Sequence, residues 1–321
     1  MNLLVLNTIS AAGFSFGEDE LALIKKEAPG LRIWQPDAKE VTDEQIRQAD
    51  VIFGWPSARH LGMAENLKWM HAPSAGIDMF ADRSLFANPG VVVTRSKDVF
   101  NIQIAEHVIM LFLALNRGLI CSVLSTAEGR WARISDQKEL TGATVLIVGA
   151  GAIGCELAKQ LQGFRCKVIG VKRDPSVKPE FFDGIYAERD MDALLPEADY
   201  IALCLPRTPD TKGMFDYRRF SLMKPSAIIS NIGRGDAVVS EDLDRALREG
   251  LLYGAGLDVT EPEPLPEGHP LWSAPNVIIT SHTSGFSVNA NKRRFEVFYD
   301  LWKRYNAGLP LHSKVDFDKG Y

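Results

Sequence analysis

A short apolar segment that ends in a glycine-rich turn limits what this chain can fold into more than any other feature. Residues 144–154 read TVLIVGAGAIG, a β-type run that stops at the pattern G-x-G-x-x-G, and residues 155–164 continue at helical spacing. In such a strand–turn–helix the first glycine permits the tight turn, the second lets the backbone approach a pyrophosphate, and the third lets the helix pack on the strand. The alternative is an ordinary glycine-rich turn. We predict a dinucleotide-binding turn formed by Gly149, Gly151, Ala152, Ile153 and Gly154.

Length and composition indicate an ordinary globular protein of two domains. The chain has 321 residues, of which 46% are hydrophobic and 24% charged. A net charge of −5 without a long basic run argues against nucleic acid or an anionic membrane as partners. No apolar run reaches the roughly 20 residues that a membrane span needs, and the N-terminus lacks the basic region of a signal peptide.

The cysteines and acidic residues give no sign of a metal site. The four cysteines form no C-x-x-C pair and lie near no histidine pair, and no carboxylate cluster or zinc spacing is present. We therefore expect no metal and a reducing compartment, the cytoplasm.

Strand-like and helix-like segments alternate in two series, which predicts parallel sheets. In the first series, strands are expected at 2–7, 31–35, 51–54, 69–72 and 91–94, with helices at 18–27 and 43–48. A long helix at 102–117 precedes the second series, whose strands are expected at 145–148, 168–171, 200–203, 227–231, 254–258 and 277–280. Six strands with a glycine turn after the first is typical of a Rossmann fold. A last helix, at 288–305, is free to pack on the first series.

Four later motifs narrow the prediction to one family. They are LPRTPDTKGMF at 205–215, SNIGRGDAV at 230–238, GLDVTEPEPLPEGHPLW at 256–272 and ITSHTSG at 279–285. In this order and spacing, over about residues 50–321, the chain resembles the D-isomer-specific 2-hydroxyacid dehydrogenase family. The resemblance implies an α/β fold in which a Rossmann nucleotide-binding domain (100–285) is inserted into a smaller flavodoxin-like catalytic domain (1–99 and 286–321). It also implies an active site in the cleft between the domains.

Reduction of a 2-oxo acid needs a cation for the carboxylate, an acid for the carbonyl oxygen, and a hydride donor. Arg234 lies between two glycines, which are expected to leave room for an approaching ligand, and its planar guanidinium suits a carboxylate. His282 suits proton transfer near neutral pH, and Glu263 suits the task of orienting the imidazole. The resemblance places Arg234, Glu263 and His282 at the family's catalytic positions. Taken singly, each has an alternative: a surface charge, a solvated carboxylate and a structural loop histidine.

Further binding residues follow from the resemblance. Ser74, Ala75 and Gly76 follow a predicted strand, and in the family the backbone N–H groups of this loop bind the substrate carboxylate; the alternative is an ordinary turn. Asp258 is expected near the nicotinamide carboxamide, or else caps backbone N–H groups. The other predicted cofactor contacts are Leu205, Pro206 and Ile232. The chain departs from the family pattern at Ser281, where proline is common, and at Arg95 and Asp98, where asparagine and glycine are common.

The end of the strand at 168–171 bears on the choice of nicotinamide cofactor. NAD-preferring Rossmann domains carry an acidic residue there for the ribose hydroxyls, whereas this chain has Lys172 and then Arg173. Two cations favour a 2′-phosphate, so NADP(H) is predicted over NAD(H), with Arg207 expected to reach the same pocket. Asp174 argues against this preference, because it is an acidic residue two positions after Lys172, and NAD(H) stays an alternative.

These observations predict a cytoplasmic reductase that uses NADPH to convert a small 2-oxo acid, such as glyoxylate or hydroxypyruvate, into a D-2-hydroxy acid. The resemblance implies a homodimer, with the helix at 102–117 as a contact region. Two alternatives remain: a related dehydrogenase of another small anion such as phosphite, and a nucleotide-sensing corepressor-like protein that recruits protein partners.

Overall fold

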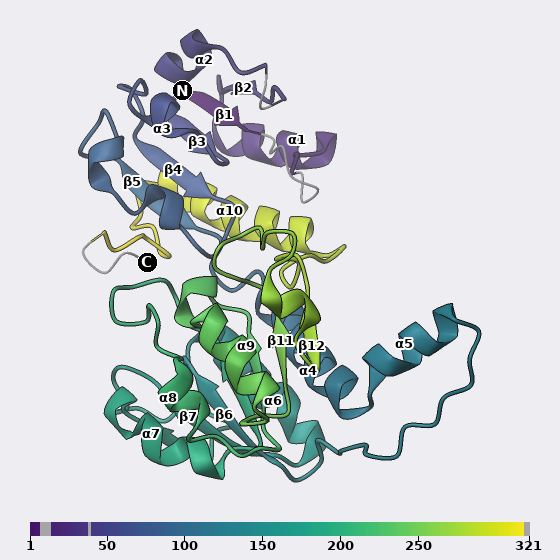
Figure 1. Ribbon diagram of the computed structural model, residues 1–321. Coiled ribbons are helices and arrows are strands. Elements are labelled where there is room, and N and C mark those ends of the chain that lie inside the picture. The colour runs from purple at the N-terminus through teal and green to yellow at the C-terminus, as the bar shows by residue number, and fades with distance from the viewer. Residues whose placement is uncertain (7–13, 38–39, 318–321) are drawn as a thin grey trace. The chain divides into compact units, whose positions relative to one another are not determined.

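The computed structural model describes residues 1–6, 14–37 and 40–317, and the chain divides into two compact units, each built on its own parallel sheet (Figure 1). One unit comprises Met1–Phe100 and Phe286–Tyr321, and the other comprises Asn101–Gly285. Each unit is described by itself below.

The first unit has a five-stranded parallel sheet in the order β2-β1-β3-β4-β5. This is the order of flavodoxin-like folds. The strands are short, and most of their residues are apolar because both faces of a parallel sheet are covered. Their bounds are β1 Asn2–Val5, β2 Arg32–Trp34, β3 Val51–Phe53, β4 Trp69–Ala72 and β5 Val92–Arg95.

Helices from both ends of the sequence cover this first sheet. Leu3 and Val5 of β1 pack on one face with Phe298 and Trp302, whereas Leu4 packs on the opposite face. The first face is covered by α1 (Glu18–Glu27) and α10 (Ala290–Asn306), and Trp302 Nε1 donates to Ile24 O at 3.0 Å. The other face is covered by α2 (Asp43–Gln48), α3 (Ala58–Leu61), η1 (Asp78–Phe80) and η2 (Arg83–Leu85).

The second unit has a seven-stranded parallel sheet in the order β12-β11-β10-β9-β6-β7-β8. Its strands are β6 Thr144–Val148, β7 Lys167–Val171, β8 Gly184–Tyr186, β9 Tyr200–Leu203, β10 Ile228–Asn231, β11 Gly254–Leu257 and β12 Val277–Ile279. Read from β8 this is the Rossmann order 3-2-1-4-5-6 with one strand added. The prediction of an α/β fold with a Rossmann domain and a flavodoxin-like domain is confirmed, but β8 was missed because it is a three-residue edge strand that begins with glycine.

Helices cover both faces of the second sheet. The α4 helix (Asn101–Asn116) packs on α6 (Ala152–Leu161) and on the sheet, where a Cβ at Gly256 would lie 2.9 Å from Leu111 Cβ. The opposite face packs against α7 (Met191–Leu194), α8 (Tyr217–Phe220) and α9 (Ser240–Arg248). The short 3-10 segments are η3 (Gln162–Phe164), η4 (Glu188–Asp190), η5 (Leu195–Glu197), η6 (Gly235–Ala237) and η7 (Pro270–Ser273).

An unpredicted helix, α5 (Leu119–Ala127), projects from the rest of the second unit (Figure 1). Gly118, with φ +61°, separates it from α4 and turns the chain by 71°. Among the described residues no single helix is long and apolar enough to span a membrane, and α4 and α5 meet that test only when taken together as a bent pair.

A fully buried histidine, His71, lies in β4 of the first sheet. His71 Nδ1 lies 2.8 Å from Thr94 Oγ1 and its Nε2 lies 3.0 Å from Ser96 Oγ, while Trp69 Nε1 also donates to Thr94 Oγ1. Burial lowers the pKa of His71 from 6.5 to about 3, and the charge of His312 acts in the same direction. Because both ring nitrogens have partners, the neutral imidazole is well satisfied in the core.

We predict that His71 makes the stability of the protein fall in acid. Between pH 6.5 and the native pKa of about 3, His71 is protonated in the unfolded chain but stays neutral in the folded chain. The contribution of His71 to the free energy of unfolding is therefore fully present above pH 6.5 and is lost as the pH falls. Urea unfolding at two pH values tests this. From neutral pH to pH ~5, wild type should lose about 2 kcal/mol more stability than His71→Phe, whose ring stays among the same aromatic side chains. Equal losses in the two proteins would contradict the prediction.

Candidate active site

The glycine turn joins β6 to α6 at the point where the strand order of the second sheet reverses. Gly149 has φ +104°, and a Cβ there would lie 2.5 Å from Cys204 O, at the end of the neighbouring strand β9. A Cβ at Gly154 would lie 2.4 Å from Gly149 O. At Gly151, the N-cap of α6, a Cβ would have no heavy atom of the described chain within 4 Å apart from the glycine and its two chain neighbours. Packing therefore requires the first and third glycines, and the second leaves open space beside a helix N-terminus, which fits a pyrophosphate.

Two cationic residues, Lys172 and Arg173, follow β7, and the carboxylate of the next residue, Asp174, is engaged in a hydrogen bond of its own turn. Lys172 Nζ donates to Val177 O at 3.1 Å, and Arg173 lies 3.7 Å from Asp210 with both side chains exposed. Asp174 accepts a hydrogen bond from Ser176 N at 3.0 Å, and hydrogen bonding to Ser176 lowers the pKa of its carboxyl. The carboxylate of Asp174 thus caps its own turn.

Arg234 lies in a loop that is pressed between two neighbouring backbones. A Cβ at Gly233 would lie 2.5 Å from Leu205 O, and one at Gly235 would lie 1.9 Å from Thr260 O. Asn231 Nδ2 also donates to Arg234 O at 2.8 Å, which fixes the loop from inside. The two glycines were expected to leave room for a ligand. The structure gives a different reason for them, because any side chain there would overlap the adjacent loops.

Glu263 and His282 are in direct contact. His282 Nδ1 lies 2.6 Å from Glu263 Oε1, and the two side chains are 52% and 42% exposed. His282 has φ +53°, in the left-handed region, and its backbone N–H donates to Asp258 O at 2.9 Å. A carboxylate on Nδ1 favours the tautomer that carries its proton there and leaves Nε2 facing outward for other partners.

The loop of His282 is held by the nearly buried carboxylate of Asp258. Oδ1 accepts hydrogen bonds from Thr280 Oγ1 at 2.6 Å and Thr283 N at 2.9 Å, and Oδ2 accepts one from Ser284 N at 3.0 Å. Asp258 was expected near the nicotinamide carboxamide, with capping as the alternative, and its bonds are those of a cap. That cofactor contact stays a prediction.

His107 supports the same loop from α4. Its Nε2 lies 2.9 Å from Thr280 Oγ1 and 3.7 Å from Asp258 Oδ1. Burial lowers the pKa of His107, and the charge of Asp258 opposes that shift. This contact has no signature in the sequence, because Thr280 lies on a loop 173 residues from His107 along the chain.

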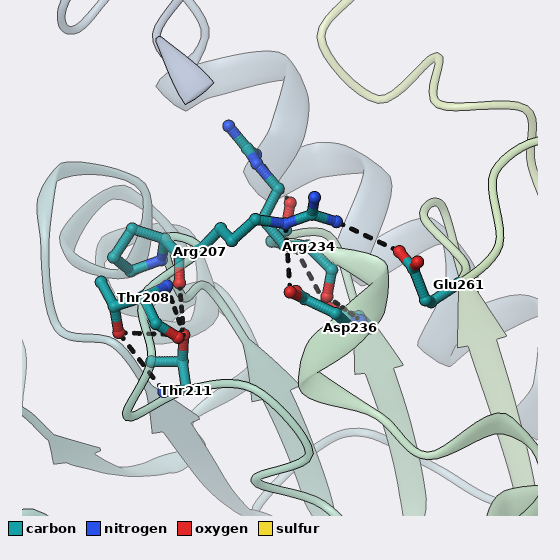
Figure 2. A network of polar contacts seen from close by, with 9 residues as sticks. Arg207, Thr208, Thr211, Arg234, Asp236 and Glu261 are labelled. Carbon is teal, nitrogen blue, oxygen red and sulfur yellow. Dashed lines mark hydrogen bonds and ion pairs between the residues drawn. The ribbon is translucent and has the colours of Figure 1, made fainter. Parts of the chain in front are cut away.

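Arg207 joins two acidic residues from different loops. Its Nε lies 3.1 Å from Asp236 Oδ2, and its Nη2 lies 3.1 Å from Glu261 Oε2. Figure 2 shows the guanidinium of Arg207 beside these two carboxylates, whereas the side chain of Arg234 extends away from them. The turn that contains Arg207 is closed by Thr211 Oγ1, which donates to Pro206 O at 2.8 Å. Arg207 was expected to reach the pocket of the 2′-phosphate; its guanidinium pairs with two carboxylates here, and the cofactor contact stays a prediction.

The predicted substrate loop lies in the first unit, at the end of β4. Arg294 Nε donates to Pro73 O at 3.0 Å, Arg95 Nη1 donates to Ala75 O at 2.8 Å, and Ser74 Oγ donates to Gly76 O at 2.7 Å. Within the described ranges, the N–H groups of Ser74, Ala75 and Gly76 have no acceptor. Arg294 is 5% exposed, and burial lowers its pKa. Sequence reasoning missed Arg294, and it noted Arg95 only as a departure from the family pattern.

The structure brings Glu263 and His282 into contact and places Arg234 in the same unit, with the glycine turn and the end of β7. Of the other predicted contacts in this unit, Ile232 is 6% exposed and its N–H donates to Leu203 O, while Leu205 is partly buried beside Gly233. The roles of all these residues stay predictions.

Comparisons with known proteins agree on one family. A family model described as D-isomer specific 2-hydroxyacid dehydrogenase, NAD binding domain, matches residues 109–284. The solved structure of a D-isomer specific 2-hydroxyacid dehydrogenase family protein from Aeromonas salmonicida is similar to this chain, with 33% identity, a TM-score of 0.85 and 99% of each chain covered.

Two similar proteins carry more specific names. The NADPH-dependent glyoxylate/hydroxypyruvate reductase of Sinorhizobium meliloti, solved with NADP and sulfate, is 27% identical with a TM-score of 0.81, and the match covers 100% of both chains. The glyoxylate reductase of Thermofilum pendens is 30% identical over 82% of this chain and 80% of that protein. The chain belongs to the D-isomer specific 2-hydroxyacid dehydrogenase family and is an oxidoreductase with a nicotinamide-dinucleotide-binding domain.

Proposed function

We propose that this protein reduces a small 2-oxo acid, such as glyoxylate or hydroxypyruvate, to the D-2-hydroxy acid and prefers NADPH. The observation that carries the proposal is the 2.6 Å contact between His282 Nδ1 and Glu263 Oε1, in the unit that also holds Arg234 and the glycine turn. The names of the similar proteins from Thermofilum pendens and Sinorhizobium meliloti support the substrate class.

The cofactor would be held by the glycine turn and by the cations after β7. The open space beside Gly151 suits the pyrophosphate, and Lys172 with Arg173 suits a 2′-phosphate. When bound, the reduced nicotinamide supplies the hydride for the carbonyl carbon of the substrate. Leu205, Pro206, Ile232 and Asp258 complete the proposed contacts.

The chain's own residues account for the remaining requirements of the reaction. The guanidinium of Arg234 binds the carboxylate of the substrate and favours negative charge on the carbonyl oxygen. Protonated His282 gives its Nε2 proton to that oxygen, while Glu263 accepts the Nδ1 proton in a hydrogen bond and stabilises the imidazolium. The N–H groups of Ser74–Gly76 are further donors to the substrate carboxylate.

An assay of NADPH oxidation with a panel of 2-oxo acids tests the proposed function. We expect turnover of at least one acid, and His282→Asn should lower kcat about 1,000-fold because the proton donor is lost. Glu263→Gln should have a smaller effect, since the imidazole stays in place. Arg248→Gln, outside the site, is the control. Tight NADPH binding without turnover of any acid would contradict the proposal and favour a nucleotide-sensing role.

The cofactor preference is tested by the ratio of kcat/KM for NADPH and NADH. Wild type should prefer NADPH, because Lys172 offers the 2′-phosphate a positive charge and Asp174 is occupied by its own turn. Lys172→Asp should shift the ratio towards NADH by about 100-fold, which corresponds to roughly 2.7 kcal/mol. A wild-type preference for NADH of about tenfold or more would overturn this part of the proposal.

We also propose a homodimer formed through α4, α5 and the loop that follows α5. Trp131 is 91% exposed, and Val123 and Leu124 of α5 are 57% and 58% exposed. A groove of about 530 Å³ is lined by residues of α4 and by Leu119 of α5, together with Arg117 and Gln160; those of α4 are Glu106, Ile109, Met110, Leu113 and Ala114. Exposed apolar side chains on neighbouring elements are typical of a protein interface.

Sedimentation velocity tests the homodimer. Wild type should sediment as a dimer at micromolar concentration, and Leu124→Glu should yield monomers because a charge would be buried in the interface. Val177→Glu, at a position that is 67% exposed in the same unit, is the matched control and should stay dimeric. Monomeric wild type would contradict the proposal.

A further inference from the structure

Arg207 occupies the gap between loops that follow three neighbouring strands. Arg207 follows β9, Asp236 follows β10 and Glu261 follows β11, and these strands are adjacent in the sheet. Because carboxyl ends of adjacent parallel strands meet at one edge, the three loops converge there. We propose that Arg207 is a positioning residue that holds the loops of Arg234 and Glu263 in register. This inference rests on the proposed function, in which those two residues act on the substrate.

The contacts of Arg207 differ from those of an ordinary surface ion pair. Its Nε and Nη2 each lie 3.1 Å from a carboxylate, and the two carboxylates belong to different loops (Figure 2). The side chain of Asp236 is only 9% exposed, and its Oδ1 has no hydrogen-bond partner in the part of the chain that the structure describes. Loss of the guanidinium would leave this nearly buried carboxylate without its cation, which is unfavourable.

Each carboxylate is coupled to a proposed active-site residue through one intervening residue. Asp236 follows Arg234 with Gly235 between them, and a Cβ at Gly235 would lie 1.9 Å from Thr260 O. The two loops therefore cannot move closer together, so the freedom that remains is to slide or separate. The two bonds of Arg207 resist that movement.

The Glu261 side of the pair leads to Glu263. Pro262 separates the two acids, and its carbonyl accepts a hydrogen bond from Thr260 Oγ1 at 2.9 Å. Ser240 Oγ donates to Glu261 O at 3.1 Å. The segment 260–262 is therefore held by two side-chain hydrogen bonds. A shift of Glu261 is therefore carried to Glu263 and to its contact with His282.

The two contacts of Arg207 predict two separable kinetic effects. Asp236→Asn weakens the contact on the Arg234 side, so it should mainly raise KM for the 2-oxo acid. Glu261→Gln weakens the contact on the Glu263 side, so it should mainly lower kcat. The kcat/KM of Arg207→Lys should lie between those of wild type and Arg207→Gln, because one ammonium group cannot bind both carboxylates in the geometry that a guanidinium allows.

Steady-state kinetics of these variants form the first arm of the test. Arg207→Gln should lower kcat/KM about 100-fold, the size of effect that a displacement of about 1 Å produces. Arg248→Gln is the matched control: Arg248 is 46% exposed against 48% for Arg207, and its Nε lies 3.0 Å from Asp244. The double variant Arg207→Gln/Asp236→Asn leaves no lone buried charge, so it should fold normally and still show the loss of kcat.

The second arm needs neither substrate nor cofactor. The ring ¹⁵N shifts of His282, assigned by their loss in His282→Gln, report which nitrogen carries the proton in mildly alkaline buffer. Wild type and Arg248→Gln should hold the proton on Nδ1, beside Glu263, whereas Arg207→Gln and Glu261→Gln should show a mixture of tautomers. If Arg207→Gln leaves the kinetic constants and the ring shifts at wild-type values, the inference is wrong. If wild type reduces no 2-oxo acid, the proposed function fails, and the ring shifts alone decide the role of Arg207.

Discussion

The carboxylate of Asp258 is the constraint on which the rest of the candidate site depends. It is 1% exposed at the end of β11 and accepts three hydrogen bonds from the segment 280–284, where His282 lies. His282 is in the left-handed region of backbone space, which costs an L-residue about 1–2 kcal/mol. The bonds to Asp258, together with that of His282 N to Asp258 O, keep the residue in this conformation. The contact between His282 and Glu263 then follows from two loops that are both fixed near the end of β11.

Much of this arrangement was predictable, because it depends on local sequence. The glycine turn after β6, the alternating segments and the order of the four motifs predict the α/β fold and the family, and both are confirmed. The motifs also identified Arg234, Glu263 and His282 as candidate catalytic residues. That assignment came from the resemblance to the family and not from the geometry of the three side chains. The expected strands of the second unit and the helix expected at 102–117 agree closely with the structure, whereas β8 and α5 were not predicted. Those two were missed because β8 has three residues and α5 keeps apolar residues exposed, so neither has a clear period.

The parts that sequence reasoning missed are contacts between distant segments. Nothing in the sequence indicates that Arg294 donates to Pro73 O, that His107 reaches Thr280, or that Arg207 joins Asp236 and Glu261. Gly235 illustrates the limit most clearly: its place beside Arg234 suggested room for a ligand, whereas the reason is the backbone of Thr260. A motif identifies the residues of a site. The reason that only glycine fits at a neighbouring position, such as 235, lies in tertiary packing and is not visible in the motif.

Three arginines of this chain, Arg95, Arg207 and Arg294, fix backbone and loops. Arg95 and Arg294 take up the carbonyls of Ala75 and Pro73, so the donors that remain in that loop are its N–H groups. Arg207 is engaged by two carboxylates, and neither arrangement requires a substrate. Preorganisation of this kind matters for catalysis because dipoles and charges that are already oriented need not reorganise when the reaction begins. These three guanidinium groups hold loops in place, and Arg234, whose loop is pressed between two backbones, is the guanidinium that we assign to the substrate.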